Sequence, residues 1–208
     1  MTQRRRIALL CASSRGQNGT GLTAWAEARM KALQEVGTID PSFHVFTVDL
    51  SKPPFPLGPL IGDYLPAGIK DSSEYPSANV RAWSRFVSSL SGLIIVTPEY
   101  NGCYTGEMKN CLDHIYNEWR GLPAIVSYAV YGGKRAGTLL SQALEGLHAD
   151  IVSQGEVEIS LPIEYIAGDR RVGKVDSEIE DAFLRAYAGI MDSVAERLAD
   201  EAFSCGRY

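Results

Sequence analysis

Short apolar runs alternate along the chain with stretches of helical periodicity. Runs of about five apolar residues between polar or turn-forming residues are typical of strands that are buried on both faces of a sheet. Three such runs predict strands at residues 7–11, 93–97 and 123–127, and two further strands are predicted at residues 45–50 and 157–161. Between them, apolar residues recur every three or four positions. This spacing predicts helices at about 22–36, 78–90, 107–119, 139–147 and 177–205, the last with a cap near Asp176 or Ser177.

Strands that alternate with helices favour a parallel sheet with helices on both faces. Five strands fit the flavodoxin-like order 2-1-3-4-5 of a three-layer α/β fold. In that order, ligands bind beyond the carboxyl ends of the strands, near the switch between the first and third strands. We therefore expect a single flavodoxin-like domain over residues 1–208, with its ligand site at that edge.

A proline-rich segment interrupts the alternation after the second predicted strand. Residues 51–76 contain six prolines, which break regular elements: Pro53, Pro54, Pro56, Pro59, Pro66 and Pro76. Because the α/β pattern resumes afterwards, the segment is interpreted as a long inserted loop rather than a linker between domains. Its length makes it a candidate functional loop.

Composition and charge narrow the class of protein. Hydrophobic residues make up 45% of the 208 residues and charged residues 22%, which is ordinary for a globular protein. The net charge of −5 argues against nucleic-acid binding, which requires a basic surface. No apolar run approaches the roughly 18 residues of a membrane span, and the start of the chain is unlike a signal peptide.

The four cysteines lack a CxxC pair or metal-binding spacing, which indicates free thiols in a reducing compartment. We expect a cytoplasmic protein with no nucleic-acid or membrane partner.

Three polar loops follow the first, third and fourth predicted strands and therefore share one edge of the sheet. The loop at 13–20 has small residues and ends at a helix start, which suits a phosphate, and Arg15 could add a charged hydrogen bond. An ordinary polar turn would have the same composition.

The second loop contains Pro98 to end the strand and the turn-forming pair Asn101 and Gly102. Its backbone N–H groups, phenol and carboxamide suit a flat heterocycle, although a simple turn fits equally well. The third loop has two glycines before a helix, which allow a close approach of backbone, and two tyrosines that could border a ring.

Together these motifs resemble the NADPH-dependent FMN reductase family, which includes flavodoxin-like FMN-containing quinone, azo-dye and metal-ion reductases. The family pattern Gly-Ser-x-Arg corresponds to Ala-Ser-Ser-Arg at 12–15, its Pro-Glu-Tyr-Asn to residues 98–101, and its Gly-Gly loop to residues 132–133. The stretch 106–113 is similar to the helix start Gly-x-x-Lys-Asn-x-x-Asp of the family. The resemblance spans residues 5–150 and departs from the family at Ala12, where the family has glycine.

The resemblance implies FMN as cofactor and NADPH or NADH as co-substrate, with thirteen cofactor-binding positions. Those implied for the phosphate are Ser13, Arg15, Asn18, Gly19 and Thr20. Those implied for the isoalloxazine ring are Pro98, Glu99, Tyr100 and Asn101 on one side and Ser127, Tyr128, Gly132 and Gly133 on the other. No catalytic side chain and no metal is implied, because the flavin carries the chemistry.

The implied reaction is a ping-pong hydride transfer. NAD(P)H reduces the flavin and leaves, and a quinone, azo compound, free flavin or other small acceptor then takes the electrons in the same space. The resemblance also implies a homodimer or homotetramer. The proline-rich segment and the helix at 107–119 are candidate interface elements, with Tyr104, Tyr116 and Trp119 as possible anchors. Packing of these three residues in the core is an equally good reading.

Two functions of other classes stay open. One is a flavodoxin-like electron carrier without NAD(P)H activity, which usually displays a more acidic face than a net charge of −5 provides. The other is a regulatory or scaffold protein that kept the fold and binds no flavin. The physiological acceptor and the choice between NADPH and NADH are not specified by the sequence. His44, His114 and His148 are expected to be structural or solvated, and Cys103 could lie near the flavin.

Overall fold

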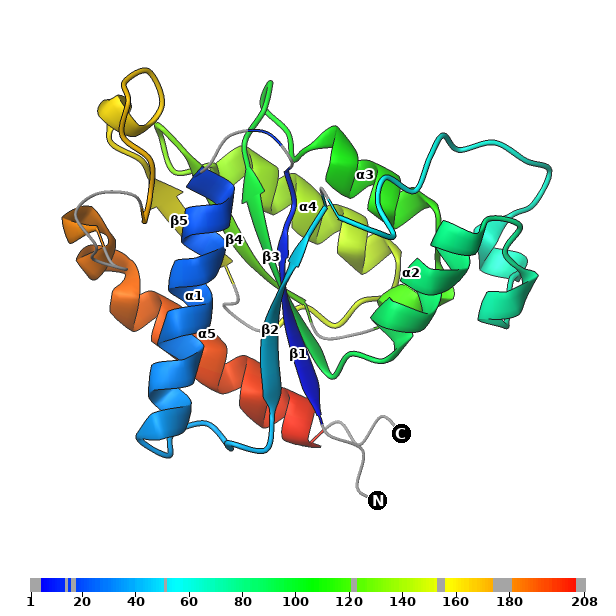
Figure 1. Ribbon diagram of the computed structural model, residues 1–208, viewed down its shortest axis with the longest axis horizontal. Coiled ribbons are helices and arrows are strands. Elements are labelled where there is room, and N and C mark those ends of the chain that lie inside the picture. The colour runs from blue at the N-terminus through cyan, green and yellow to red at the C-terminus, as the bar shows by residue number, and fades with distance from the viewer. Residues whose placement is uncertain are drawn as a thin grey trace.

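A five-stranded parallel sheet forms the centre of the fold (Figure 1). The computed structural model describes residues 5–13, 15, 18–50, 52–120, 123–152, 156–173 and 181–204. Within them the strands are β1 (Arg6–Cys11), β2 (His44–Asp49), β3 (Gly92–Pro98), β4 (Pro123–Ala129) and β5 (Glu156–Ser160). Their order is β2-β1-β3-β4-β5 and every neighbouring pair is parallel. The predicted fold class is therefore confirmed.

Helices cover both faces of this sheet. They are α1 (Asn18–Glu35), α2 (Ala78–Ser88), α3 (Gly106–Asp113), α4 (Lys134–Gly146) and α5 (Arg185–Ser204). Figure 1 shows α1 and α5 on one face and α2, α3 and α4 on the other. No helix in the described ranges is both long enough and apolar enough to span a membrane.

Strands β1 to β4 contribute side chains to two separate cores, and β5 contributes to one of them. On β1, Ile7 and Leu9 pack in the core beneath α1 and α5, whereas Ala8 and Leu10 pack in the core beneath α2, α3 and α4. Successive side chains of a strand point to opposite faces, so a strand covered on both sides needs an unbroken apolar run. This explains why the strand predictions agree with the structure to within two residues.

The helix predicted at 107–119 is too long. The structure ends α3 at Asp113 and forms only a short 3₁₀ turn at Asn117–Trp119. The backbone N–H of Tyr116 donates to Oε2 of Glu118 at 3.2 Å, which removes it from the helical ladder. Trp119 is buried and its Nε1 donates to the carbonyl of Leu112 at 3.3 Å, so this residue packs in the core.

Two other helix boundaries also differ from the prediction. Helix α1 begins at Asn18 rather than residue 22, so three residues assigned to the first loop form the first helical turn. Helix α5 begins at Arg185, after a 3₁₀ turn at Ala182–Leu184, rather than at residue 177. The predicted cap at Asp176 or Ser177 and the predicted end at Cys205 lie outside the described residues.

The proline-rich segment packs against the core beneath α2, α3 and α4. Its side chains Phe55, Leu57 and Tyr75 are buried there. From α3 and its C-terminal cap, Asn110 and His114 both hydrogen-bond the carbonyl of Gly58 at 3.0 Å. These contacts fix the loop against α3, on the face of the sheet that α2, α3 and α4 cover.

Glu118 connects this loop to two other elements. Its carboxylate accepts from Oη of Tyr75 at 3.3 Å, from Oγ of Ser84 at 2.6 Å and from the N–H of Tyr116 at 3.2 Å. Burial, together with the neighbouring Glu118 charge, raises the pKa of Tyr75 above its ordinary value. The phenol therefore stays protonated and keeps its hydrogen bond.

Replacement of this carboxylate should destabilise the fold. Glu118→Ala leaves three donors without their acceptor, and we expect a loss of about 2 kcal/mol in the free energy of unfolding. Urea unfolding followed by tryptophan fluorescence measures it. Glu145→Ala, on the exposed side of α4, is the control and should stay within about 0.5 kcal/mol of wild type. An equal effect of both substitutions would contradict the assigned role.

Candidate functional site

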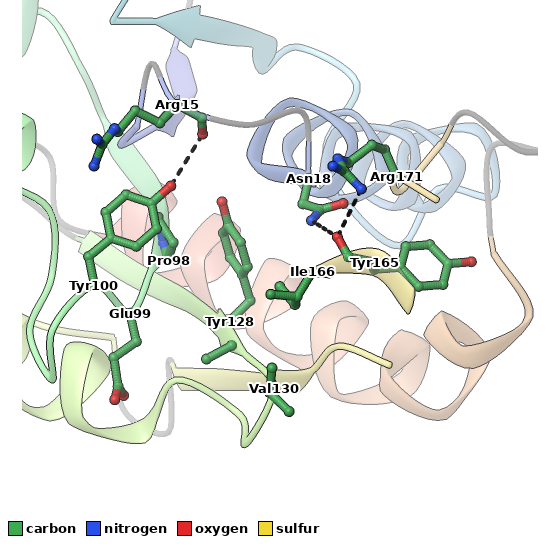
Figure 2. A pocket seen from close by; sticks show the side chains of 11 residues that line it. Arg15, Asn18, Pro98, Glu99, Tyr100, Tyr128, Val130, Tyr165, Ile166 and Arg171 are labelled. Carbon is green, nitrogen blue, oxygen red and sulfur yellow. Dashed lines mark hydrogen bonds between the residues drawn. The ribbon is translucent and has the colours of Figure 1, made fainter. Parts of the chain in front are cut away.

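Loops after four strands enclose one cavity at the carboxyl edge of the sheet (Figure 2). The cavity has a volume of about 340 Å³, within the range of small-molecule sites. Predicted site residues that line it are Arg15, Asn18, Pro98, Glu99, Tyr100 and Tyr128. The lining also includes five residues that were not predicted: Ala129, Val130, Tyr165, Ile166 and Arg171.

The loop after β1 is bonded to the loop after β3. Oγ of the buried Ser13 accepts from the N–H of Arg15 at 3.1 Å and lies 3.4 Å from Oη of Tyr100. That phenol donates to the carbonyl of Arg15 at 3.3 Å, and the Arg15 guanidinium lies 6.0 Å from the centre of the Tyr100 ring. Ser13 therefore holds the two loops together and is not part of the cavity lining.

The predicted turn at Asn101 and Gly102 is present and has a definite type. Tyr100 and Cys103 exchange two backbone hydrogen bonds, of 2.9 and 3.1 Å. The two residues between them have φ of 54° and 75°, and a two-residue loop with both φ positive is a type I′ turn, for which Asn-Gly is the preferred sequence. Asn101 is exposed and does not line the cavity, and Cys103 is half-buried at the end of the turn.

Glu99 joins the loop after β3 to helix α4. Its N–H donates to the carbonyl of Tyr128 at 3.0 Å, which continues the pairing of β3 with β4. Its Oε2 accepts from the N–H groups of Arg135 and Ala136 at 3.1 and 3.4 Å. The residue at the start of α4, Gly133, has no side chain to cap the helix, so a carboxylate from the neighbouring loop satisfies these donors.

The conformation of the glycine loop after β4 is determined by contacts with the residues of β4 next to it. Gly132 and Gly133 have φ of 89° and 68°, and a Cβ at Gly133 would lie 2.6 Å from the backbone nitrogen of Tyr128. Oγ of the buried Ser127 donates to the carbonyl of Gly132 at 3.4 Å. These three predicted site residues support the turn and are not in the cavity lining.

Tyr128 extends from β4 towards the first turn of α1. A Cβ at Gly19 would lie 2.8 Å from Oη of Tyr128 and 3.0 Å from Sγ of Cys11, so only glycine allows this packing. Burial raises the pKa of Tyr128 and also that of the Cys11 thiol. Both groups therefore stay protonated near neutral pH. Thr20, also assigned to the phosphate, is exposed on α1 and outside the lining.

The loop after β5 forms a wall that the sequence analysis missed. Nδ2 of Asn18 donates to the carbonyl of Tyr165 at 2.8 Å, and the N–H of Val172 donates to Oδ1 of Asn18 at 3.1 Å. Both ends of the Asn18 amide are thus engaged in holding this loop. Its position in the predicted topology could have identified this loop as part of the site, because a loop after the fifth parallel strand opens at the same edge as the other three.

Contacts with the ligand stay predictions for all thirteen predicted residues. The structure brings six of them together around the cavity and places seven behind it or outside the lining. Those seven are Ser13, Gly19, Thr20, Asn101, Ser127, Gly132 and Gly133.

Comparison with known proteins supplies the family. Residues 5–161 match the family model described as NADPH-dependent FMN reductase. The chain belongs to this family. The resemblance seen in the three loop motifs is thereby confirmed, and the match extends past them to the end of β5.

Proteins that are similar to the chain include two curated relatives and one solved structure. The NAD(P)H-dependent FMN reductase LOT6 of Saccharomyces cerevisiae is 36% identical over 126 residues, which are 60% of this chain and 65% of the yeast protein. The 2-hydroxy-1,4-benzoquinone reductase of a Burkholderia species is 30% identical over 141 residues, which are 62% of this chain and 70% of that protein. The chain therefore spans slightly less than two thirds of the yeast relative.

The solved structure is FerB, a flavoenzyme NAD(P)H:(acceptor) oxidoreductase from Paracoccus denitrificans. It superposes with a TM-score of 0.64 at 19% identity and covers 96% of this chain and 98% of its own. At that identity the likeness supports the fold.

Gly133 provides a test of how the family's glycine loop is built. Gly133→Ala combines a left-handed backbone with a Cβ pressed against the backbone of Tyr128, so we expect a loss of about 2–4 kcal/mol in unfolding free energy. Gly146→Ala is the matched control on the same helix, where an added Cβ meets nothing and the change should be neutral or slightly stabilising. Thermal unfolding of both variants decides the matter, and a tolerated Gly133→Ala would refute this account.

Proposed function

We propose that the protein is an FMN-dependent NAD(P)H oxidoreductase that passes electrons to small-molecule acceptors. The observation that carries the proposal is that the three motif-bearing segments after β1, β3 and β4 contribute residues to one cavity, through Arg15, residues 98–100 and Tyr128. Because the chain matches only part of the length of its yeast relative, activity and substrates are proposed here rather than transferred from that protein.

The residues around the cavity fit FMN. An elongated ligand with a flat ring and an anionic phosphate needs aromatic surface in one part of its site and positive charge in another. The rings of Tyr100 and Tyr128 provide the first, and Arg15 and Arg171 provide the second. The first turn of α1 adds a helix N-terminus, which favours phosphate.

The side chains of the cavity bind and orient rather than react. When bound, FMN supplies hydride acceptance and release, which no amino-acid side chain provides. Tyr128 stays protonated because its pKa is raised, so it can donate a hydrogen bond but does not serve as a base near neutral pH. Glu99 is engaged with two backbone N–H groups of α4. Its role is to hold the second and third loops in register.

We extend the proposal to a ping-pong order and to quinones or azo compounds as acceptors. One cavity bordered by all four loops favours alternating use of the same space by NAD(P)H and acceptor. Relatives named 2-hydroxy-1,4-benzoquinone reductase and FMN-dependent NADPH-azoreductase support these acceptor classes. Free flavin is a further candidate acceptor.

A homodimer is proposed as the working assembly. The proline-rich segment carries three strongly exposed apolar side chains, Leu60, Ile61 and Leu65, each more than half exposed. Exposed apolar groups close together in one loop favour a protein contact. A homotetramer would be consistent with the same surface.

Flavin content and reduction by NAD(P)H test the central proposal. We expect the purified protein, after addition of FMN, to retain a flavin absorbance that is released by denaturation and identified as FMN. Anaerobic addition of NADPH or NADH should bleach this absorbance, and a benzoquinone should restore it. A protein that retains FMN but is not bleached would be an electron carrier. A protein that stays colourless would be a scaffold without flavin.

A further inference from the structure

An arginine outside the family motifs lies at the α1 end of the cavity. Arg171, from the loop after β5, is half-buried and lines the cavity beside Asn18 (Figure 2). Its Nη1 donates to the carbonyl of Gly168 at 2.7 Å and to that of Tyr165 at 3.4 Å. Across the described ranges, no carboxylate pairs with Arg171. Its charge is thus oriented by the protein and is not neutralised by an acidic partner there.

The loop that carries Arg171 is fixed to the first turn of α1. Asn18 holds it through Tyr165 on one side and Val172 on the other. One turn further along, a Cβ at Gly21 would lie only 2.1 Å from the carbonyl oxygen of Val172. Glycine at this position therefore lets the residue next to Arg171 approach the helix backbone. The guanidinium is held beside a helix N-terminus by contacts on both of its flanks.

The two arginines of the cavity have different positions. Arg15 lies over the Tyr100 ring and its backbone bonds that phenol, which places it at the loop after β3. Arg171 is on the other side of Tyr128, next to the start of α1 (Figure 2). The N–H groups at a helix start and a planar guanidinium are the protein groups best suited to a phosphate. Arg171 places a guanidinium beside the first turn of α1, although the loop that carries it has no family motif.

We propose that Arg171 binds the phosphate of FMN, so that the cofactor is held by the loop after β5 as well as by the loop after β1. This inference rests on the proposed function. A phosphate-bearing NADPH could use the same chemistry, and the position beside the first turn of α1 favours FMN. The consequence is selectivity, because a charged contact with phosphate strengthens binding of FMN and leaves riboflavin unaffected.

Binding of FMN and riboflavin to the flavin-free protein tests the assignment. Quenching of flavin fluorescence gives both dissociation constants for wild type, Arg171→Gln and Arg171→Lys. We expect Arg171→Gln to weaken FMN binding about tenfold or more while riboflavin binding stays within about twofold, since a charged hydrogen bond to phosphate is lost. Arg171→Lys should be intermediate. Arg120→Gln, at an exposed position before β4 and outside the cavity lining, is the control and should leave both constants unchanged.

Three results would overturn the assignment or its premise. Equal weakening of FMN and riboflavin would mean that Arg171 only shapes its loop. Unchanged FMN binding with a selective rise in the KM for NADPH over NADH would move the contact to the dinucleotide. A wild-type protein that binds neither flavin would refute the proposed function itself. If the wild type binds FMN but Arg171→Gln does not weaken FMN binding selectively over riboflavin binding, only the role of Arg171 is refuted.

Discussion

Parallel pairing of all five strands is the constraint from which the site follows. Every strand in a parallel sheet ends at the same edge, and each must be joined to the next by a crossover that returns over one face. The loops after β1, β3, β4 and β5 are therefore brought together although they are separated by up to about 160 residues of sequence. The two apolar cores serve this arrangement, because they hold helices against both faces and leave the carboxyl edge to polar loops.

Contacts between these loops are made largely through backbone groups. Tyr100 donates to a carbonyl of the loop after β1, and Glu99 accepts from two N–H groups at the start of α4. Asn18 donates to a carbonyl of the loop after β5 and accepts from an N–H of the same loop. Each side chain satisfies a backbone group that would otherwise need water or a ligand. Several motif residues therefore act by fixing the backbone that surrounds the cavity, which is a different role from touching the ligand.

Burial keeps two ionisable groups near the cavity in their neutral, unreactive forms. Burial raises the pKa of the Cys11 thiol and of the Tyr128 phenol. Groups held in their neutral forms neither attack a substrate nor transfer protons readily near neutral pH. Such surroundings suit a site whose chemistry belongs to a bound cofactor, and they leave positive charge as the main electrostatic feature, at Arg15 and Arg171.

The sequence by itself determined the strand order, the family and the three motif loops. Unbroken apolar runs require burial on both faces, and the Pro-Glu-Tyr-Asn and Gly-Gly motifs encode local backbone shapes that do not depend on distant residues. Tertiary structure alone decided the roles of Asn18 and Glu99, whose partners lie far away in the chain. It also placed Glu118, beyond the end of α3, between Tyr75 and Ser84, and it brought Arg171 to the cavity. Periodicity reports which face of an element is buried, whereas the partner of a polar side chain depends on which loops the fold brings together.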